Sequence, residues 1–538
     1  MRAPKKDRRR RKDPREMGAA TGACRASRNG SSGGLYFLRG CAKLPAAGPP
    51  FLLRTTVNQH SALLVSVVAV PVAGVFILPL AGRVSATFRN LLAFACGLWA
   101  FLGSCCLLPV AAAGGQTVSR AGLCFGFDVA LTADALAVFM ALVSSSLSTL
   151  IILFSFDYIS HYDNQNEYYA MVSLFLGAMM GLVFSSNLVL LYIFWEITAI
   201  TSWRLIGFFR SADDVVRADK SFLVTVFGAV LMLAGFVSLA QTAGTWDLAR
   251  LRDAFFAKPL PPLAVVLILS GILSKSATLP FHTWLPDAGV APSPVTALLH
   301  AAVLVKIGVY VFARLFVATV PLDGSWRIAV GAVAAASALI SAGAALRENN
   351  LKRLIAFSTI SQIGFIFFAL SLDTELGLVA GLLYILMHGL AKAGLFLCAG
   401  ILEQATGTRD IRQMGGLAAG MPVTMTAFLL CAFSVMGVPP FGGFFSKTAL
   451  FVGAIEQGSV ALAGVFLVGS FLTVLYLLRA ATLVFFGPAR DRAVREGSPL
   501  MVATVALLAL LSLGAGVFIS YPVSFAGAAA RQMLGVGP

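Results

Sequence analysis

Long apolar segments, separated by short polar ones, dominate the chain. Apolar runs recur from residue 62 to residue 519, and each has about the twenty residues that a helix needs to cross a hydrocarbon core of roughly 30 Å. The strands of a membrane β-barrel would instead alternate apolar and polar residues. The pattern therefore predicts an all-α polytopic membrane protein with fourteen transmembrane helices, called spans 1 to 14 below, which begin near residues 62, 90, 134, 167, 188, 221, 262, 294, 327, 353, 377, 422, 461 and 499.

Composition agrees with this pattern. The 538 residues are 58% hydrophobic and 12% charged, whereas soluble proteins carry about 25% charged residues. This composition excludes a soluble enzyme and a disordered protein. Short connections between the spans favour one bundle over residues 61–520, followed by a short C-terminal tail, 521–538.

Most of the net charge lies at the N-terminus. Residues 1–60 hold 14 Lys and Arg against 3 Asp and Glu, which is +11 of the total of +16. We interpret this segment, with its run Arg8-Arg9-Arg10-Arg11-Lys12, as a disordered basic tail and expect no nucleic-acid partner.

The positive charges of the loops predict the orientation of the bundle. Loops after spans 1, 5, 9, 11 and 13 carry nearly twice as many Lys and Arg as the loops of the other side, so they are predicted to be cytoplasmic, in a prokaryotic inner membrane. Both ends of the bundle would then be external, and the basic tail would have to cross the membrane. We therefore hypothesise that translation starts close to span 1 and that residues 1–56 are absent from the native protein. An intact mass that includes Met1 would contradict this hypothesis.

Charged residues inside the predicted spans are the main functional signal. A charged side chain near the bilayer centre costs several kcal/mol, so such residues usually face a wet interior and mark an ion or proton path. The alternatives are lysines that extend to the membrane surface and ion pairs that only hold helices together. The charged residues within spans are Glu196, Arg204, Lys275, Lys306, Lys392, Lys447 and Arg479.

Two of these lysines stand beside prolines that break helices. Lys275 lies five residues before Pro280, and Lys447 lies seven residues after Pro440, which follows Pro439. Proline interrupts the helical hydrogen bonds, and broken helices in membranes line cavities. The similar settings, with Leu-Pro-Phe at 279–281 and Pro-Pro-Phe at 439–441, also suggest an internal duplication.

The remaining candidates can hold or pass protons. Glu196 needs a basic partner, and a Glu facing a Lys can exchange protons; Arg204, two turns further along, is a possible modulator. His300 shares span 8 with Lys306. His388 and Lys392 are four residues apart on one face of span 11, a spacing that suits a proton relay, although such a histidine can also be a simple packing residue.

The sequence gives no sign of a cofactor. The eight cysteines form no CxxC pattern, and no phosphate-binding loop or dinucleotide motif is present. We expect no metal site and no redox chemistry in this chain, so its energy would come from an ion gradient or a partner.

Six ordered motifs together resemble the antiporter-like subunits of respiratory complex I, Mrp cation/proton antiporters and membrane-bound energy-converting hydrogenases. The resemblance covers roughly residues 60–520. The motifs are FWEITAI (194–200), KSATLPFHTWLPDAGVAPSPVTALLHAAVLVKIGVY (275–310), LKRLIAFSTISQIGF (351–365), MHGLAKAGLF (387–396), GTRDIRQMGGL (407–417) and GVPPFGGFFSK (437–447).

The resemblance implies two inverted five-helix repeats, about 167–317 and 327–486, with spans 7 and 12 broken. It also implies roles: Glu196 and Lys275 as the glutamate-lysine pair of a first half-channel, and Lys447 as the terminal lysine of a second. Lys306 and His300 would connect the two, with His388 and Lys392 at the centre. Arg204 departs from the family, which usually has an apolar residue there.

Three functions remain open. The first is a proton- or cation-translocating subunit of a redox-driven translocase, such as a NADH-quinone oxidoreductase-like or hydrogenase-like complex, with iron-sulfur, flavin or nickel-iron partners. The second is a subunit of an Mrp-type Na+/H+ antiporter, and the third is a membrane scaffold that does not pump. All three predict other membrane subunits of the same complex, including sister antiporter-like subunits, as partners.

Overall fold

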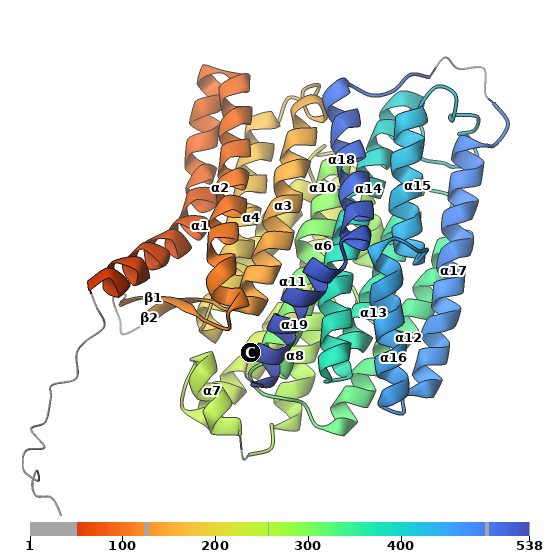
Figure 1. Cartoon of the computed structure of the whole chain (residues 1–538). Coiled ribbons are helices and arrows are strands. Elements are labelled where there is room, and N and C mark those ends of the chain that lie inside the picture. The colour runs from red at the N-terminus through yellow and green to blue at the C-terminus, as the bar shows by residue number, and fades with distance from the viewer. Residues whose placement is uncertain (1–50, 123–127, 257, 490–493, 537–538) are drawn as a thin grey trace, which may run out of the picture. The chain divides into compact units, whose positions relative to one another are not determined.

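The chain folds into a bundle of membrane-spanning helices. A computed structural model describes residues 51–122, 128–256, 258–489 and 494–536, and this part is mostly helical (Figure 1). Twelve of the described helices are long and apolar enough to cross a membrane, and two shorter apolar helices, at spans 7 and 12, accompany them. The prediction of an all-α polytopic membrane protein is confirmed. The predicted basic tail lies, up to residue 50, outside the described residues.

Spans 1 to 6 are each one continuous helix, and capping residues set the start of several of them. Ser85, Asp134 and Ser211 each stand directly before a helix, where the side chain accepts a hydrogen bond from a backbone N–H of the first turn. The six helices are α1 (Phe51–Val84), α2 (Ala86–Ala112), α3 (Ala135–Tyr158), α4 (Gln165–Phe184), α5 (Leu188–Ile206) and α6 (Ala212–Ala243).

A β-hairpin connects spans 2 and 3. Strands β1 (Thr117–Gly122) and β2 (Asp128–Ala133) pair antiparallel, with Thr117 opposite Ala133. The sequence pattern does not predict this hairpin, because six-residue strands give a weak signal beside much longer apolar runs.

Spans 7 and 12 are broken. Span 7 consists of α8 (Pro262–Lys275) and the short α9 (Trp284–Asp287), and span 12 of α15 (Pro422–Met436) and α16 (Gly442–Glu456). Pro280 lies in the first interruption, and Pro439 and Pro440 lie in the second. Both interruptions therefore coincide with residues that cannot continue a helical hydrogen-bond ladder.

Span 8 changes its helical form along its length. After the 3-10 turn η2 (Ala288–Val290) it runs through α10 (Ser293–Ala297), the π-helical η3 (Leu298–Ala302), α11 (Leu304–Phe312) and the π-helical η4 (Ala313–Val317). Such π-helical turns are rare and frequently found at functional sites. His300 lies in η3, Lys306 in α11 and Arg314 in η4.

The remaining helices complete the bundle. Two short ones lie outside the predicted spans: α7 (Leu248–Phe255) between spans 6 and 7, and α19 (Ser520–Leu534) in the C-terminal segment. The others are α12 (Gly324–Arg347), α13 (Leu351–Ser371), α14 (Glu375–Thr406), α17 (Val460–Phe485) and α18 (Pro499–Val517).

Helix α14, which is span 11, lies at the centre of the second part of the bundle. It packs against α10, η3, α13, α15, α16, α18 and α19, and nearly all of its residues are buried.

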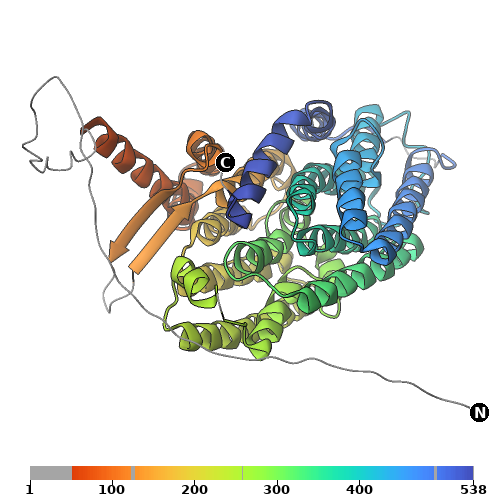
Figure 2. The same cartoon turned by 60° about the horizontal axis from the view of Figure 1, so that its bottom comes forward.

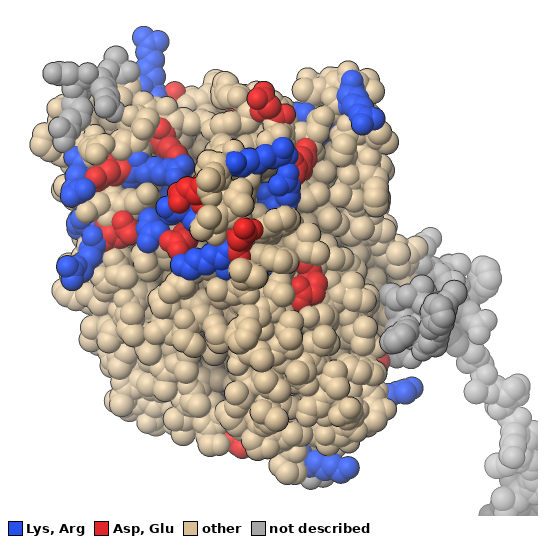
Figure 3. All heavy atoms as spheres, turned by 180° about the vertical axis from the view of Figure 1, so that it is seen from behind, with Lys and Arg blue, Asp and Glu red and all other residues tan. Residues whose placement is uncertain are grey.

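Figure 2 shows the helices closer to end-on, with α1 at one edge and α17 at the other. Figure 3 shows most of the charged side chains of one face gathered toward one end and a few at the opposite end, with a broad, largely uncharged band between them that suits contact with lipid tails.

Two isolated backbone bridges occupy matching places in the chain. Asn187 pairs with Asp247 and Asn350 with Asp410, both antiparallel. Each asparagine caps the helix of the second span of a predicted repeat, α5 or α13, and each aspartate follows the third span. This correspondence favours the duplication, whose exact bounds stay a prediction.

Candidate ion-translocation site

All four lysines predicted to translocate ions are buried. Lys275, Lys306 and Lys392 have no exposed surface and Lys447 is 5% exposed. The two histidines beside them are equally buried. Burying this many bases costs free energy unless other contacts compensate for the lost water. Charged residues buried in a membrane are therefore usually functional.

Lys275 and Glu196 meet where span 7 breaks. Lys275 is the last residue of α8, and its Nζ donates to the backbone oxygen of Trp195 at 3.2 Å and lies 5.3 Å from the centre of the Trp195 ring. Glu196 is the next residue of α5 and lies within electrostatic range of Lys275, although no ion pair joins the two among the described residues. One carboxylate oxygen of Glu196 is buried and has no hydrogen-bond partner among the described residues. The predicted pair is therefore brought together without direct contact.

Lys306 reaches from span 8 to the central helix. Its Nζ donates to the backbone oxygen of Ala301. A Cβ atom placed on Gly389 of α14 would lie 2.4 Å from this Nζ, so the amine occupies the space that the missing side chain leaves. Gly389 directly follows His388, and the Lys306 amine lies within electrostatic range of the His388 ring.

The two histidines have no hydrogen bonds within the described part of the chain. Both ring nitrogens of His300 and both of His388 are buried and unpartnered. The ring of His300 lies 4.4 Å from that of Phe396, centre to centre, and is tilted by 39° against it. His388 lies within electrostatic range of His300 and of the amines of Lys306, Lys392 and Lys447, which places it in the middle of the predicted row.

A hydrogen-bonded chain of neutral side chains leads away from Lys392. Its Nζ donates to Ser358 Oγ at 2.6 Å, and this hydroxyl lies 2.7 Å from the hydroxyl of Tyr476. Gln362 Nε2 donates to the same tyrosine at 3.4 Å, and Gln362 Oε1 accepts from Tyr384. The chain thus joins α13, α14 and α17 inside the bundle.

Lys447 lies where this chain ends. Its Nζ is 5.8 Å from the centre of the Tyr384 ring and 4.9 Å from that of Phe365. It donates to the backbone oxygens of Val435 at 2.9 Å and Met436 at 3.4 Å, the last residues of α15. Free carbonyls at a helix C-terminus favour a cation, so the break in span 12 provides the site for this amine.

Arg204 and Arg479 do not join the row of bases. Arg204 pairs with Glu167 of α4, which Arg210 also contacts, rather than with Glu196. Arg479 donates to the backbone oxygen of Glu348 at 2.8 Å and to Asn349 Oδ1 at 2.5 Å. Both arginines hold helix ends in place, and the role of Arg204 as a modulator of Glu196 stays a prediction.

Sequence reasoning missed two buried ion pairs and the neutral chain. Lys352, at the start of α13, is buried and lies 2.7 Å from Glu403. Arg314, near the end of span 8, forms a bidentate pair with Asp134. Ser358 and Gln362 stand in the polar run STISQ, which is the sequence feature that could have indicated the neutral chain.

Among the described residues, no three His, Cys, Asp or Glu side chains lie close enough to hold a metal ion.

Comparison with known proteins identifies the family. Residues 185–473 match the model of the family described as "NADH:quinone oxidoreductase/Mrp antiporter, TM". The chain belongs to this family. All the predicted site residues from Glu196 to Lys447 fall inside the matched region.

Similar curated proteins in this family are antiporter subunits. The chain is 34% identical over 425 residues to the A1 subunit of a Na(+)/H(+) antiporter from Staphylococcus saprophyticus, in an alignment that covers 73% of this chain and 53% of that protein. It is 38% identical over 352 residues to a Na(+)/H(+) antiporter subunit from Alkalihalophilus pseudofirmus, covering 62% and 43%. The chain thus spans about half the length of the curated relatives it matches.

Solved structures of the same fold belong to multi-subunit membrane complexes. A chain of the Mrp complex from a Dietzia species superposes with a TM-score of 0.80 at 25% identity, over 88% of this chain and 98% of that one. A chain of an archaeal membrane-bound sulfane sulfur reductase gives 0.81 at the same identity and coverage. The chain therefore shares the fold of these antiporter-like membrane chains, and its helices are long and apolar enough to cross a membrane several times.

Proposed function

We propose that this chain is the ion-translocating part of an Mrp-type Na+/H+ antiporter complex in a bacterial cytoplasmic membrane. The sequence alone favoured a subunit of a redox-driven complex and kept the Mrp-type antiporter as an alternative. The similarity to named antiporter subunits favours the antiporter instead. The row of buried bases from Lys275 to Lys447 is the observation that carries ion translocation itself.

In the proposed mechanism, charge moves by electrostatic coupling along this row. Protonation of one amine disfavours protonation of the next, because like charges repel strongly where water is scarce. The charge of Glu196 acts on Lys275, and the effect passes through Lys306, His300 and His388 to Lys392. From there the neutral chain through Ser358, Tyr476, Gln362 and Tyr384 continues the proton path to Lys447.

The partners of this chain would be other membrane subunits of the complex. The two solved neighbours are chains of multi-subunit membrane assemblies. A respiratory complex stays the second candidate because the sulfane sulfur reductase chain has an equally similar fold.

Transport and composition of the native complex test the proposal. The complex is extracted in mild detergent, its subunits and its iron, nickel and flavin are quantified, and it is returned to vesicles that carry an internal pH dye. Sodium-dependent pH change without stoichiometric iron or flavin is expected. Co-purifying iron-sulfur or flavin subunits with donor-dependent pumping would favour the redox complex instead. A wild-type complex that moves neither protons nor Na+ would leave only the scaffold function.

A further inference from the structure

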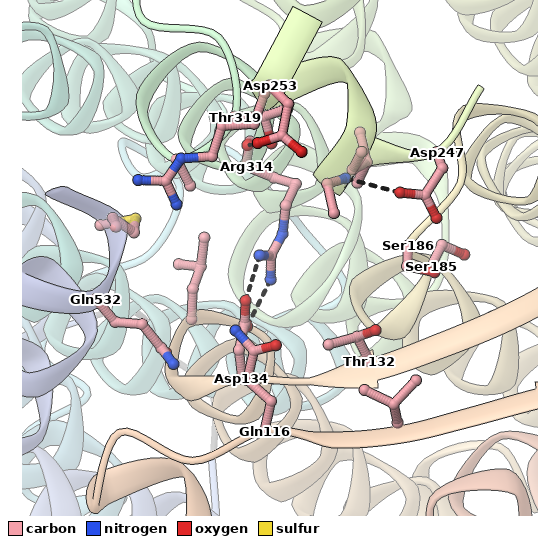
Figure 4. A pocket seen from close by; sticks show the side chains of 17 residues that line it. Gln116, Thr132, Asp134, Ser185, Ser186, Asp247, Asp253, Arg314, Thr319 and Gln532 are labelled. Atoms are coloured by element: carbon pink, nitrogen blue, oxygen red, sulfur yellow. Dashed lines mark hydrogen bonds and ion pairs between the residues drawn. The ribbon is translucent and has the colours of Figure 1, made fainter. Parts of the chain in front are cut away.

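A polar cavity opens at the side of the bundle predicted to be external. Its volume is about 310 Å³, and it is lined by β1, β2, α7, the ends of spans 4 and 8, and α19 (Figure 4). These segments belong to the connections after spans 2, 4, 6, 8 and 14, all of which the distribution of Lys and Arg places outside. The cavity thus reaches into the bundle from the external water.

The inner wall of this cavity contains the Asp134–Arg314 ion pair. Figure 4 shows the two side chains joined by two hydrogen bonds, one of which, from Arg314 to Asp134 Oδ1, measures 2.7 Å. The two side chains are only 12% and 11% exposed. Arg314 Nε also donates to the hydroxyl of Tyr310 at 2.9 Å, and Tyr310 is buried one helical turn above Lys306 on span 8. The pair therefore stands between the cavity and the helix face that carries Lys306.

Helix α3 continues inward from Asp134 with two unusual serines. The hydroxyls of Ser144 and Ser148 are fully buried and find no hydrogen-bond partner in the part of the chain that the structure describes. Their neighbours behave differently: Ser145 donates to the backbone oxygen of Ala141 at 2.6 Å, and Thr149 donates to that of Ser145 at 2.7 Å. A buried hydroxyl without a protein partner is ordinarily satisfied by water.

The two serines face the region of the central bases. Helix α3 packs against η3 and α14, which carry His300 and His388. A Cβ atom on Gly389 would lie 2.8 Å from Leu147 Cδ1 and 2.4 Å from Lys306 Nζ, so Leu147, between the two serines in sequence, lies beside this amine. The unpartnered hydroxyls and the unpartnered histidines thus line the same interface.

We propose that α3 lines an external proton route that runs from the cavity past Tyr310, Ser144 and Ser148 to Lys306 and His300, with the Asp134–Arg314 pair as its outer gate. This inference rests on the proposed function. The carried species is the proton, because the described groups beyond Asp134 are hydroxyls, an amine and imidazoles. These groups pass protons along water, whereas Na+ prefers a set of oxygen ligands such as carboxylates and carbonyls.

Accessibility of single cysteines to Ag+, added from one side of sealed membrane vesicles, tests the route. The native complex carries a variant chain without its eight cysteines and with Ser144→Cys or Ser148→Cys, alone or together with Arg314→Gln. Thiols left unreacted are counted after denaturation. We expect both cysteines to react with external Ag+, and Arg314→Gln to speed the reaction about tenfold by removing the gate.

The matched control is Ser145→Cys. Ser145 lies on the same helix, but its hydroxyl donates a hydrogen bond within the helix, to the backbone oxygen of Ala141. It should stay unreactive in both backgrounds. Reaction of Ser144→Cys and Ser148→Cys no faster than the control, or only from the cytoplasmic side, would overturn the route. Equal rates with and without Arg314→Gln would overturn the gate.

A second measurement avoids the cysteine substitutions. Hydroxyl-radical footprinting of the otherwise native complex reports water contact at Tyr310 and Leu147. Modification of both should rise with Arg314→Gln, and an unchanged rate would also overturn the gate. Neither readout requires transport. If the vesicles exchange Na+ for protons but external Ag+ and water do not reach these positions, the route is rejected and the proposed function is not. Vesicles with access but no exchange in the wild type reject the proposed function.

Discussion

The two halves of the bundle hold their lysines by different means. In the first half, spans 4 to 8, Lys275 has a carboxylate nearby, Glu196, and a backbone oxygen, Trp195 O, as its hydrogen-bond acceptor. In the second half, spans 9 to 13, Lys392 bonds to a chain of neutral side chains, and Lys447 bonds to the carbonyls at the end of a half-helix. Helix breaks recur at matching places, but the chemistry around them does not.

This difference suggests a division of labour. An ionised carboxylate changes the local field when its own charge changes, and therefore suits a trigger. Neutral hydroxyl and amide groups keep the same charge while they pass a proton and reorient, and therefore suit conduction. We accordingly expect the first half to respond to charge substitutions and the second half to the loss of single hydrogen bonds.

The largest effect should come from the charged pair of the first half. Lys275→Ala and Glu196→Gln should each lower exchange at least about 100-fold, which corresponds to about 2.7 kcal/mol. Glu196→Gln leaves the buried Lys275 without its opposite charge, and Lys275→Ala removes the amine on which Glu196 acts. Exchange is measured by dye in vesicles, and assembly by size-exclusion chromatography. Normal exchange in both variants, with intact assembly, would remove the trigger from the first half.

Stability should also depend on charge where span 8 of the first half meets the start of α3. Burial raises the pKa of Asp134, but the charge and hydrogen bonds of Arg314 outweigh this and hold the pKa below its usual value. The pair therefore stabilises the fold above the unfolded-state pKa of about 3.9, and this stability is lost as pH falls through the lower folded-state pKa.

We expect Asp134→Asn to lower the free energy of unfolding by about 2 kcal/mol at pH 7. The difference from the wild type should shrink as the pH falls below about 4. Thermal unfolding in detergent measures both. The control Asp213→Asn breaks an exposed pair with Arg217 and should cost no more than about 0.5 kcal/mol. A pH-independent difference for Asp134→Asn would show that packing rather than charge is responsible.

The junction between the halves depends on a missing side chain. Gly389→Ala should displace the Lys306 amine from its place beside His388, and we expect exchange to fall about tenfold, or 1.4 kcal/mol. The bundle should still assemble, because the end of a flexible lysine moves more easily than a backbone. Gly343→Ala is the control, since nothing lies within 4 Å of a Cβ atom at this helical position. Equal exchange in the two variants would show that the position of the Lys306 amine does not matter.

The smallest effect should come from the neutral chain of the second half. Tyr476→Phe removes the hydroxyl that joins Ser358 to Gln362, and one hydrogen bond of about 1 kcal/mol predicts a roughly fivefold loss of exchange. Tyr168→Phe breaks a bond of the same 2.7 Å length, to Ser155, outside the chain and should leave exchange intact. If the two variants behave alike, the chain from Lys392 to Tyr384 carries no protons.

The sequence predicted the membrane helices and most of the buried bases because the bilayer makes both conspicuous. A span must be apolar for its whole length, and a lysine within it stands out against its neighbours. The breaks at Pro280 and Pro440 were predictable for the same reason, since proline acts on its own helix. Arg204 was harder to interpret, because a charge near the end of a span is equally compatible with an ion pair such as the one it forms with Glu167.

Contacts between helices decided the rest. Ser358, Tyr476 and Gln362 look like ordinary residues of an apolar span, and only packing joins them into one chain. The π-helical turns that carry His300 and Arg314 likewise have no sequence signal of their own. The sequence by itself therefore determined the membrane helices and most of the bases that are buried among them. Only the tertiary structure decided which of them meet, because hydrogen bonds across helices depend on register and rotation, and a single sequence encodes neither locally.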